Sequence, residues 1–210
     1  YMPFRGSQIA WLDSGEADSY KLKVVDNKFV WSKNEIFDEE FRVKTKSWQG
    51  FLKPTTFGDI NSTICAHVNT NKTGSNSYDG YNISWIDERV IPFLIQLRDW
   101  QEKYNPILNP SRWDNVVISK KETISELSKY GHNGSSCFLF RDPTFDGKSP
   151  IHQRQIGATL TGILHLIEDP ELLLTYHQKN TGLKEGQVAT SLSGIRSYFT
   201  LHSMRVSLIT

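Results

Sequence analysis

The spacing of apolar and polar positions predicts a helix followed by a β-hairpin at the start of the chain. Residues 2–12 have the pattern of a helix end, which stops at Asp13-Ser14-Gly15. Polar and apolar residues then alternate in Lys21–Val25 and in Lys28–Ser32. Asp26-Asn27 lies between these two stretches and tolerates positive φ, which suits a two-residue turn. We therefore expect two short antiparallel strands here.

The next stretches predict a second strand pair and then a long helix. Residues 62–69 and 80–85 have strand character, and the polar segment at 70–77 between them is rich in turn-forming residues. From Val90 to Tyr104, apolar residues recur at spacings of three and four. This spacing predicts an amphipathic helix that ends near Asn105-Pro106.

The second half of the sequence predicts mostly helices. We expect a short helix from a capping box at Ser119–Glu122 to Gly131, a helix ending at Asp169-Pro170, a helix over Leu172–Lys179, a polar loop over 183–196, and a last helix from about Thr200. The fold class we predict is α+β, a mainly helical domain with a small antiparallel sheet near its N-terminus. We interpret the Pro- and Asn-rich stretch 105–114 as a loop within one domain spanning 1–210.

Composition narrows the possible functions without choosing one. The net charge of +1 gives no general basic character, so a nucleic-acid site would have to be formed locally by folding. Cys65 and Cys137 are far apart in the sequence, and the histidines lack metal-ligand spacing, so we expect no metal and no other cofactor. No apolar run is long enough to cross a membrane, and we expect a reduced, cytoplasmic setting.

A candidate phosphate site lies near the C-terminal end of the sequence. Thr200 is a good N-cap, which places His202 and Arg205 in the first turns of a helix, on one face. The free N–H groups and the helix dipole favour an anion at the same place. By itself, a His and an Arg three residues apart more often lie on a solvated helix face.

Three further motifs occur in an order that is similar to the catalytic domain of tyrosine recombinases, the phage-type integrases. Arg5 precedes Trp11-Leu12-Asp13 and the predicted strands, Lys72-Thr73-Gly74 lies in a turn between strands, and Phe138-Leu139-Phe140 precedes the later helices. His202-Ser203-Met204-Arg205 completes the order. The resemblance covers nearly the whole chain, and its strength lies in the combination.

The resemblance implies a site and a chemistry. Arg5, Lys72, His202 and Arg205 would be catalytic, and they would cleave and rejoin DNA through a 3′-phosphotyrosine without metal. Two more cations, Lys148 and Arg154, flank the start of a helix near Pro150 and could contact DNA phosphates, although ordinary surface charge is the simpler interpretation. The implied partner is a double-stranded recombination site, bound by a homo-oligomer in a prokaryotic cytoplasm.

The chain departs from the family pattern in three places. Gln8 stands where an acidic residue usually braces the first arginine, and the stretch from Ile36 to Asp59 is longer than in compact members. The tyrosine nucleophile would follow Arg205, and residues 206–210 contain no tyrosine. We therefore expect a C-terminally truncated catalytic domain, with a core-binding domain upstream. Two alternatives stay open: a catalytically inactive DNA-binding module of the same fold, and a type IB topoisomerase.

Overall fold

The computed structural model divides the chain into two compact units. Unit 1 consists of Tyr1–Met2 and Ser7–Ile151, and unit 2 of Pro3–Gly6 and His152–Thr210. The residues that the structure describes are 4, 6–35, 50–56, 63–69, 80–84, 86–116, 134–144, 146–168, 174–177 and 195–198.

Unit 1 contains the β-hairpin that the sequence predicts. Strands β1 (Tyr20–Val25) and β2 (Lys28–Lys33) pair antiparallel, with Val25 opposite Lys28. Asp26 and Asn27 form the turn with φ values of 49° and 58°. Positive φ at both central residues matches the right-handed twist of the two strands, which explains why this dipeptide forms a two-residue turn.

A three-stranded antiparallel sheet follows in the order β3-β4-β5. Its strands are β3 (Leu52–Pro54), β4 (Ile64–Val68) and β5 (Tyr81–Ile83). The pairing of β4 with β5 confirms the predicted strands at 62–69 and 80–85. The sequence did not predict β3, because three residues are too few to establish an alternating pattern.

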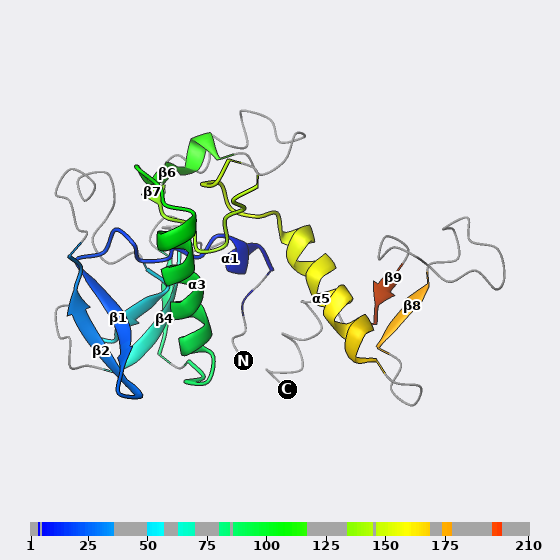
Figure 1. The fold of residues 1–210 in the computed structure, drawn as a ribbon, viewed down its shortest axis with the longest axis horizontal. Coiled ribbons are helices and arrows are strands. Elements are labelled where there is room, and N and C mark those ends of the chain that lie inside the picture. The colour runs from blue at the N-terminus through cyan, green and yellow to red at the C-terminus, as the bar shows by residue number, and fades with distance from the viewer. Residues whose placement is uncertain are drawn as a thin grey trace. The chain divides into compact units, whose positions relative to one another are not determined.

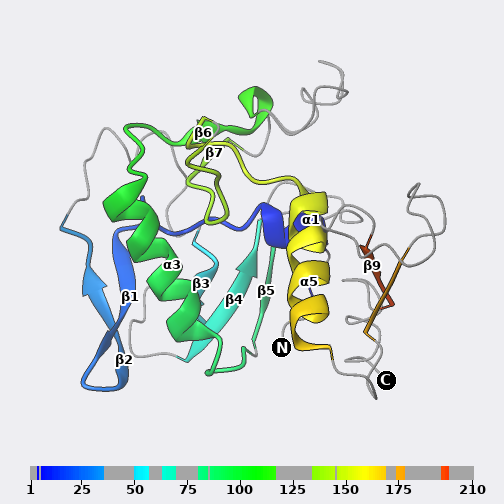
Figure 2. The ribbon, with the colours of Figure 1, turned by 45° about the vertical axis from the view of Figure 1, so that its right-hand side comes forward.

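Helix α3 (Ile91–Tyr104) confirms the long helix predicted from apolar spacing. Figures 1 and 2 both show it lying beside the strands of unit 1. Its buried face includes Ile91, Ile95 and Arg98. The Arg98 guanidinium donates a 2.9 Å hydrogen bond to the carbonyl oxygen of Leu22, and Glu102 pairs with Lys21. Both contacts hold α3 against β1.

An aromatic cluster forms the core beneath the short helix α1 (Gly6–Ala10). The ring centroid of Trp11 lies 4.4 Å from that of Trp113 and 6.1 Å from that of Phe138. Trp113 begins the 3-10 helix η1 (Trp113–Asn115), next to the paired strands β6 (Ser111–Arg112) and β7 (Ser135–Ser136). Its indole N–H donates to the Ser136 hydroxyl at 2.8 Å. The end of the stretch 105–114, which was interpreted as a loop, therefore belongs to β6 and η1.

Unit 2 contains helix α5 (Gln153–Ile167), strand β8 (Thr175–His177) and strand β9 (Ile195–Ser197). The helix confirms the prediction for this stretch, and His152 caps it through a reciprocal capping box with Gln155. At its other end, the Glu168 carboxylate accepts hydrogen bonds from the backbone of Leu174 and Thr175. These bonds connect the end of α5 to β8.

Two predictions for the second half were wrong. Instead of a helix over Leu172–Lys179, Thr175–His177 is a strand paired with β9, and β9 itself enters the stretch 183–196 predicted to be a loop. A β-branched and an aromatic residue favour extended backbone here, and the partner strand lies about twenty residues away, where local periodicity gives no signal. The helices predicted from 119 to 131 and from Thr200 lie outside the described residues.

The description as mainly helical was also wrong. The described part has a mixed α+β fold, in which helices α1, α3 and α5 are accompanied by several small antiparallel sheets. Among these residues, no helix is both long and apolar enough to span a membrane.

The aromatic cluster predicts unequal roles for two tryptophans. Trp113 is fully buried, whereas Trp100 on α3 is 44% exposed. Trp113→Ala should lower the free energy of unfolding by about 3–5 kcal/mol through the lost burial and the cavity left behind. Trp100→Ala, the matched control, should cost about 1 kcal/mol or less. Urea unfolding of both variants measures this, and equal losses would show that Trp113 is not the core residue described.

Candidate functional site

The four residues predicted to be catalytic, Arg5, Lys72, His202 and Arg205, lie outside the described residues. The structure does describe the elements next to two of them. Helix α1 begins at Gly6, directly after Arg5, and strands β4 and β5 border the connection that contains Lys72. That connection joins the second and third strands of the β3-β4-β5 sheet, the position that the family resemblance implies for its lysine.

Helix α1 and strand β5 contact each other through Gln8 and Tyr81. The Gln8 amide nitrogen donates a 3.2 Å hydrogen bond to the Tyr81 hydroxyl. Gln8 is buried in α1, and Tyr81 is the first residue of β5. The segment that follows Arg5 and the segment that follows the Lys72 connection are therefore linked by side chains.

The hairpin of β4 and β5 has a well-defined base. His67 lies opposite Asn82, and its Nδ1 donates a 2.7 Å hydrogen bond to the side-chain Oδ1 of Asn82. Burial lowers the pKa of His67 to about 4, with the charge of Lys53 adding to the effect. His67 is therefore neutral near pH 7 and provides no positive charge for a phosphate. Its role in this hairpin is structural.

Two segments of the family resemblance lie side by side in unit 1. The backbone N–H of Ser14 donates to the carbonyl of Cys137 at 2.7 Å, and the N–H of Leu139 donates to the carbonyl of Leu12 at 2.8 Å. Asp13 forms a β-bridge with Phe138 between them. Trp11-Leu12-Asp13 and Phe138-Leu139-Phe140 are thus joined as a short ladder, although more than 120 residues separate Asp13 from Cys137 in the sequence.

The Asp13 carboxyl group is buried at this ladder. Its Oδ1 accepts from the Gly15 N–H at 2.8 Å and its Oδ2 from the Cys137 N–H at 2.9 Å. Burial raises the pKa of Asp13 to about 7, with the nearby Asp18 carboxylate adding to the effect and the two backbone donors opposing it. Because the group is enclosed and its oxygens already accept bonds from the backbone, it acts within the framework of the fold.

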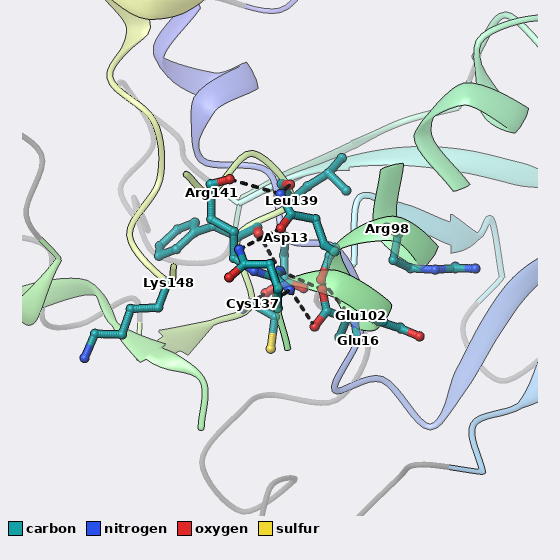
Figure 3. Close-up of polar contacts among 12 residues, drawn as sticks. Asp13, Glu16, Arg98, Glu102, Cys137, Leu139, Arg141 and Lys148 are labelled. Carbon is teal, nitrogen blue, oxygen red and sulfur yellow. Dashed lines mark hydrogen bonds and ion pairs between the residues drawn. The ribbon is translucent and has the colours of Figure 1, made fainter. Parts of the chain in front are cut away.

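Arg141 extends this cluster toward α3, as Figure 3 shows. Its guanidinium donates to both carboxylate oxygens of Glu16, at 2.6 and 3.2 Å, and to the carbonyls of Phe138 and Asn105. Gln101 of α3 donates to the carbonyl oxygens of Leu139 and Arg141. The Arg141 side chain is fully buried. Its charge is thus neutralised by Glu16 and is not presented to a ligand.

This buried cluster was missed by sequence reasoning, apart from Asp13 as part of a motif. Glu16 and Arg141 resemble ordinary surface charges in the sequence, and their pairing depends on a contact across 125 positions. A lone Arg after Phe138-Leu139-Phe140 was the available signal. Among the described residues, no group of three or more His, Cys, Asp or Glu side chains could hold a metal ion.

The two predicted DNA-binding residues are both exposed, and they belong to different units. Lys148 lies near the end of unit 1, and Figure 3 shows its side chain directed away from the Arg141 cluster. Arg154 is in the first turn of α5, in unit 2, and its backbone N–H donates to the His152 ring. Both side chains are accessible enough to contact a phosphate.

The buried ion pair predicts a large loss of stability when one partner is removed. Arg141→Gln leaves Glu16 buried without its cation, so the free energy of unfolding should fall by about 3–5 kcal/mol. The exposed Arg112–Asp114 pair is the control, because Arg112→Gln should cost about 1 kcal/mol or less. Chemical denaturation of the two variants tests this, and similar small losses would contradict the structural role of Arg141.

Asp13 predicts a specific pH dependence of stability. Its pKa is raised in the fold, so the folded state binds the proton more tightly than the unfolded state. Its contribution is therefore fully present below about pH 4 and is lost as the pH rises through 7, by at most about 1.4 kcal/mol per pH unit. His67 changes stability with pH in the opposite direction. Its pKa is lowered from 6.5 to about 4, so its contribution to the free energy of unfolding rises with pH over that range.

Comparison with Asp13→Asn isolates the effect of Asp13. The variant retains the His67 contribution and lacks the ionisable group, so the unmodified protein should lose stability relative to it between pH 4 and 8. Denaturant midpoints measured across this range give the difference. Two parallel stability curves would show that the pKa of Asp13 is not raised.

Comparison with known proteins adds a family to this geometry. A family model described as "Putative integrase" matches residues 1–114, more than half of the chain, and the match includes Arg5, the Lys72 connection and helix α3. No curated protein and no solved structure matches the chain. The chain belongs to this integrase family.

Proposed function

We propose that the chain is part of the catalytic domain of a tyrosine recombinase, which cuts and rejoins double-stranded DNA at a specific site. The observation that supports this most directly is the hydrogen bond between Gln8 and Tyr81. It connects the helix that follows Arg5 with the strand that follows the Lys72 connection, in a member of an integrase family. A shared site for Arg5 and Lys72 requires such proximity of their supporting elements.

The two arginines would bind the scissile phosphate. Arg5 and Arg205 can each donate in a fork to non-bridging oxygens, and they would stabilise the negative charge that increases in the transition state. His202, at a helix start, would donate to the same phosphate or assist proton movement at the nucleophile. This arrangement needs no metal, because the guanidinium groups supply the positive charge.

Lys72 would act as the general acid. The tyrosine nucleophile that the family resemblance implies would give its phenolic proton to His202 and attack phosphorus, so that a Tyr O–P bond forms as the bond to the 5′-oxygen breaks. Lys72 gives its proton to that oxygen, which leaves as a 5′-hydroxyl, while DNA remains attached through a 3′-phosphotyrosine. General acids of this kind contribute typically about 10²–10⁴-fold to the rate.

Lys148 and Arg154 would contribute to binding rather than to chemistry. Both are exposed cations, which suits contacts with the DNA backbone and a salt-dependent affinity. A homo-oligomer would assemble on the two recombination sites, in the prokaryotic cytoplasm.

The proposal predicts a covalent protein–DNA adduct. Full-length protein incubated with a nicked suicide substrate should form an adduct resistant to denaturation, in the presence of EDTA. Arg205→Ala should lower the rate of its formation by about 10²–10³-fold, since one preorganised donor to the transition state is lost. Unchanged adduct formation in this variant, or strict dependence on a divalent metal, would overturn the proposed site.

The role of Lys72 can be separated from that of the arginine. A substrate with sulfur in place of the 5′-oxygen has a leaving group that needs no proton. Lys72→Ala should therefore be strongly impaired on the oxygen substrate and restored on the sulfur substrate, whereas Arg205→Ala should stay impaired on both. Failure of sulfur to restore Lys72→Ala would exclude Lys72 as the general acid. Supercoil relaxation without strand exchange would instead indicate a topoisomerase.

A further inference from the structure

Gln8 stands where the family resemblance leads us to expect an acidic residue, three positions after Arg5. It extends from α1, whose C-terminal end is held firmly by the aromatic cluster. Ala10 and Leu12 are buried, and the Trp11 ring lies 4.4 Å from that of Trp113. These contacts hold the helix from which the Gln8 side chain extends. The amide nitrogen of Gln8 lies 3.2 Å from the Tyr81 hydroxyl.

Tyr81 marks the point where the chain returns to the sheet after the Lys72 connection. Its backbone pairs with Val68 across β4 and β5. The preceding Gly80 has φ of +64°, and a Cβ built there would lie only 2.0 Å from the Val68 carbonyl oxygen. Only glycine fits this close approach of backbone, so the path into Tyr81 is narrowly defined.

We propose that Gln8 and Tyr81 are positioning residues for Lys72. Lys72 lies four residues after Val68 and nine before Tyr81, so both ends of its connection are attached to one strand pair. A bond from α1 to the Tyr81 hydroxyl restrains this strand pair relative to the helix that follows Arg5. The inference rests on the proposed function, because it concerns the delivery of the general acid to a phosphate bound by Arg5.

The chemistry of the pair suits positioning rather than proton transfer. The bond joins a side-chain amide to a hydroxyl group, so it can hold a distance without placing a carboxylate or a cation beside Arg5. A carboxylate at position 8 would instead attract the arginine. In this chain, the buried Gln8 side chain is instead bonded to β5, the strand that follows the Lys72 connection.

The test is the effect of Tyr81→Phe on the two leaving groups. This variant keeps the ring and removes only the hydroxyl of a partly exposed side chain, so the fold should be retained. Loss of one neutral hydrogen bond that positions Lys72 should slow adduct formation on the 5′-oxygen substrate by about twofold to tenfold. The rate on the 5′-sulfur substrate should not change, because that leaving group does not use Lys72.

Gln8→Met and the double variant with Tyr81→Phe establish that one bond is responsible. Each single variant should show the same selective defect, and the double variant should be no slower than either one, since both remove the same hydrogen bond. Tyr104→Phe on α3 is the matched control, because it removes a hydroxyl from a tyrosine that is 60% exposed, and its rates should equal those of the unmodified protein.

The outcomes separate this inference from the proposed function. If the unmodified protein forms no adduct with either substrate, the proposed function fails and the inference fails with it. If the unmodified protein forms the adduct and Tyr81→Phe slows both substrates equally, or neither, the positioning role is wrong and the recombinase proposal stands. A defect on the oxygen substrate alone, shared by Gln8→Met, supports the role.

Discussion

The short ladder between residues 12–14 and 137–139 is the contact on which the architecture of unit 1 depends. Its backbone hydrogen bonds join the segment after α1 to a segment that follows α3 in the sequence. The aromatic rings of Trp11, Trp113 and Phe138 pack against one another beside it. Because α1 leads directly into this ladder, the position of the chain after Arg5 is set by a long-range contact.

The Asp13 carboxyl group explains how this contact tolerates a buried polar residue. Its two oxygens each accept a backbone N–H, one local at Gly15 and one across the ladder at Cys137. An amide has only one acceptor oxygen and would direct its own N–H₂ at one of these donors. The same enclosure opposes ionisation, and burial raises the pKa to about 7. The fold thus gains a specific connection, and its contribution to stability falls as the pH rises from about 4 through 7.

The elements that were predicted from the sequence are those with a local cause. The β1–β2 turn follows from Asp26-Asn27, and α3 follows from apolar spacing over four turns. Strand β8 was mistaken for a helix because its partner β9 is distant in the sequence. For the same reason, periodicity could not indicate that Glu16 and Arg141 form a buried pair.

The candidate site was predictable only as an order of motifs. The structure shows how some elements next to these motifs contact each other. Helix α1 contacts β5 through Gln8, and Trp11-Leu12-Asp13 pairs with Phe138-Leu139-Phe140. The sequence alone identified Gln8 as a departure from the family pattern, without indicating its partner. A glutamine gives no sign of which of many hydroxyl groups it will reach, since that depends on how β5 is placed beside α1.

The near-neutral composition has a structural counterpart in unit 1. Buried Arg98 and Arg141 donate to backbone carbonyls, and several of the described cations of unit 1 are paired with carboxylates. These are Lys21, Arg89, Arg98, Arg112 and Arg141. A cation neutralised in this way contributes little potential at a distance, because its field is cancelled by the adjacent carboxylate. Binding of a polyanion such as DNA to unit 1 would therefore rely on cations outside these pairs.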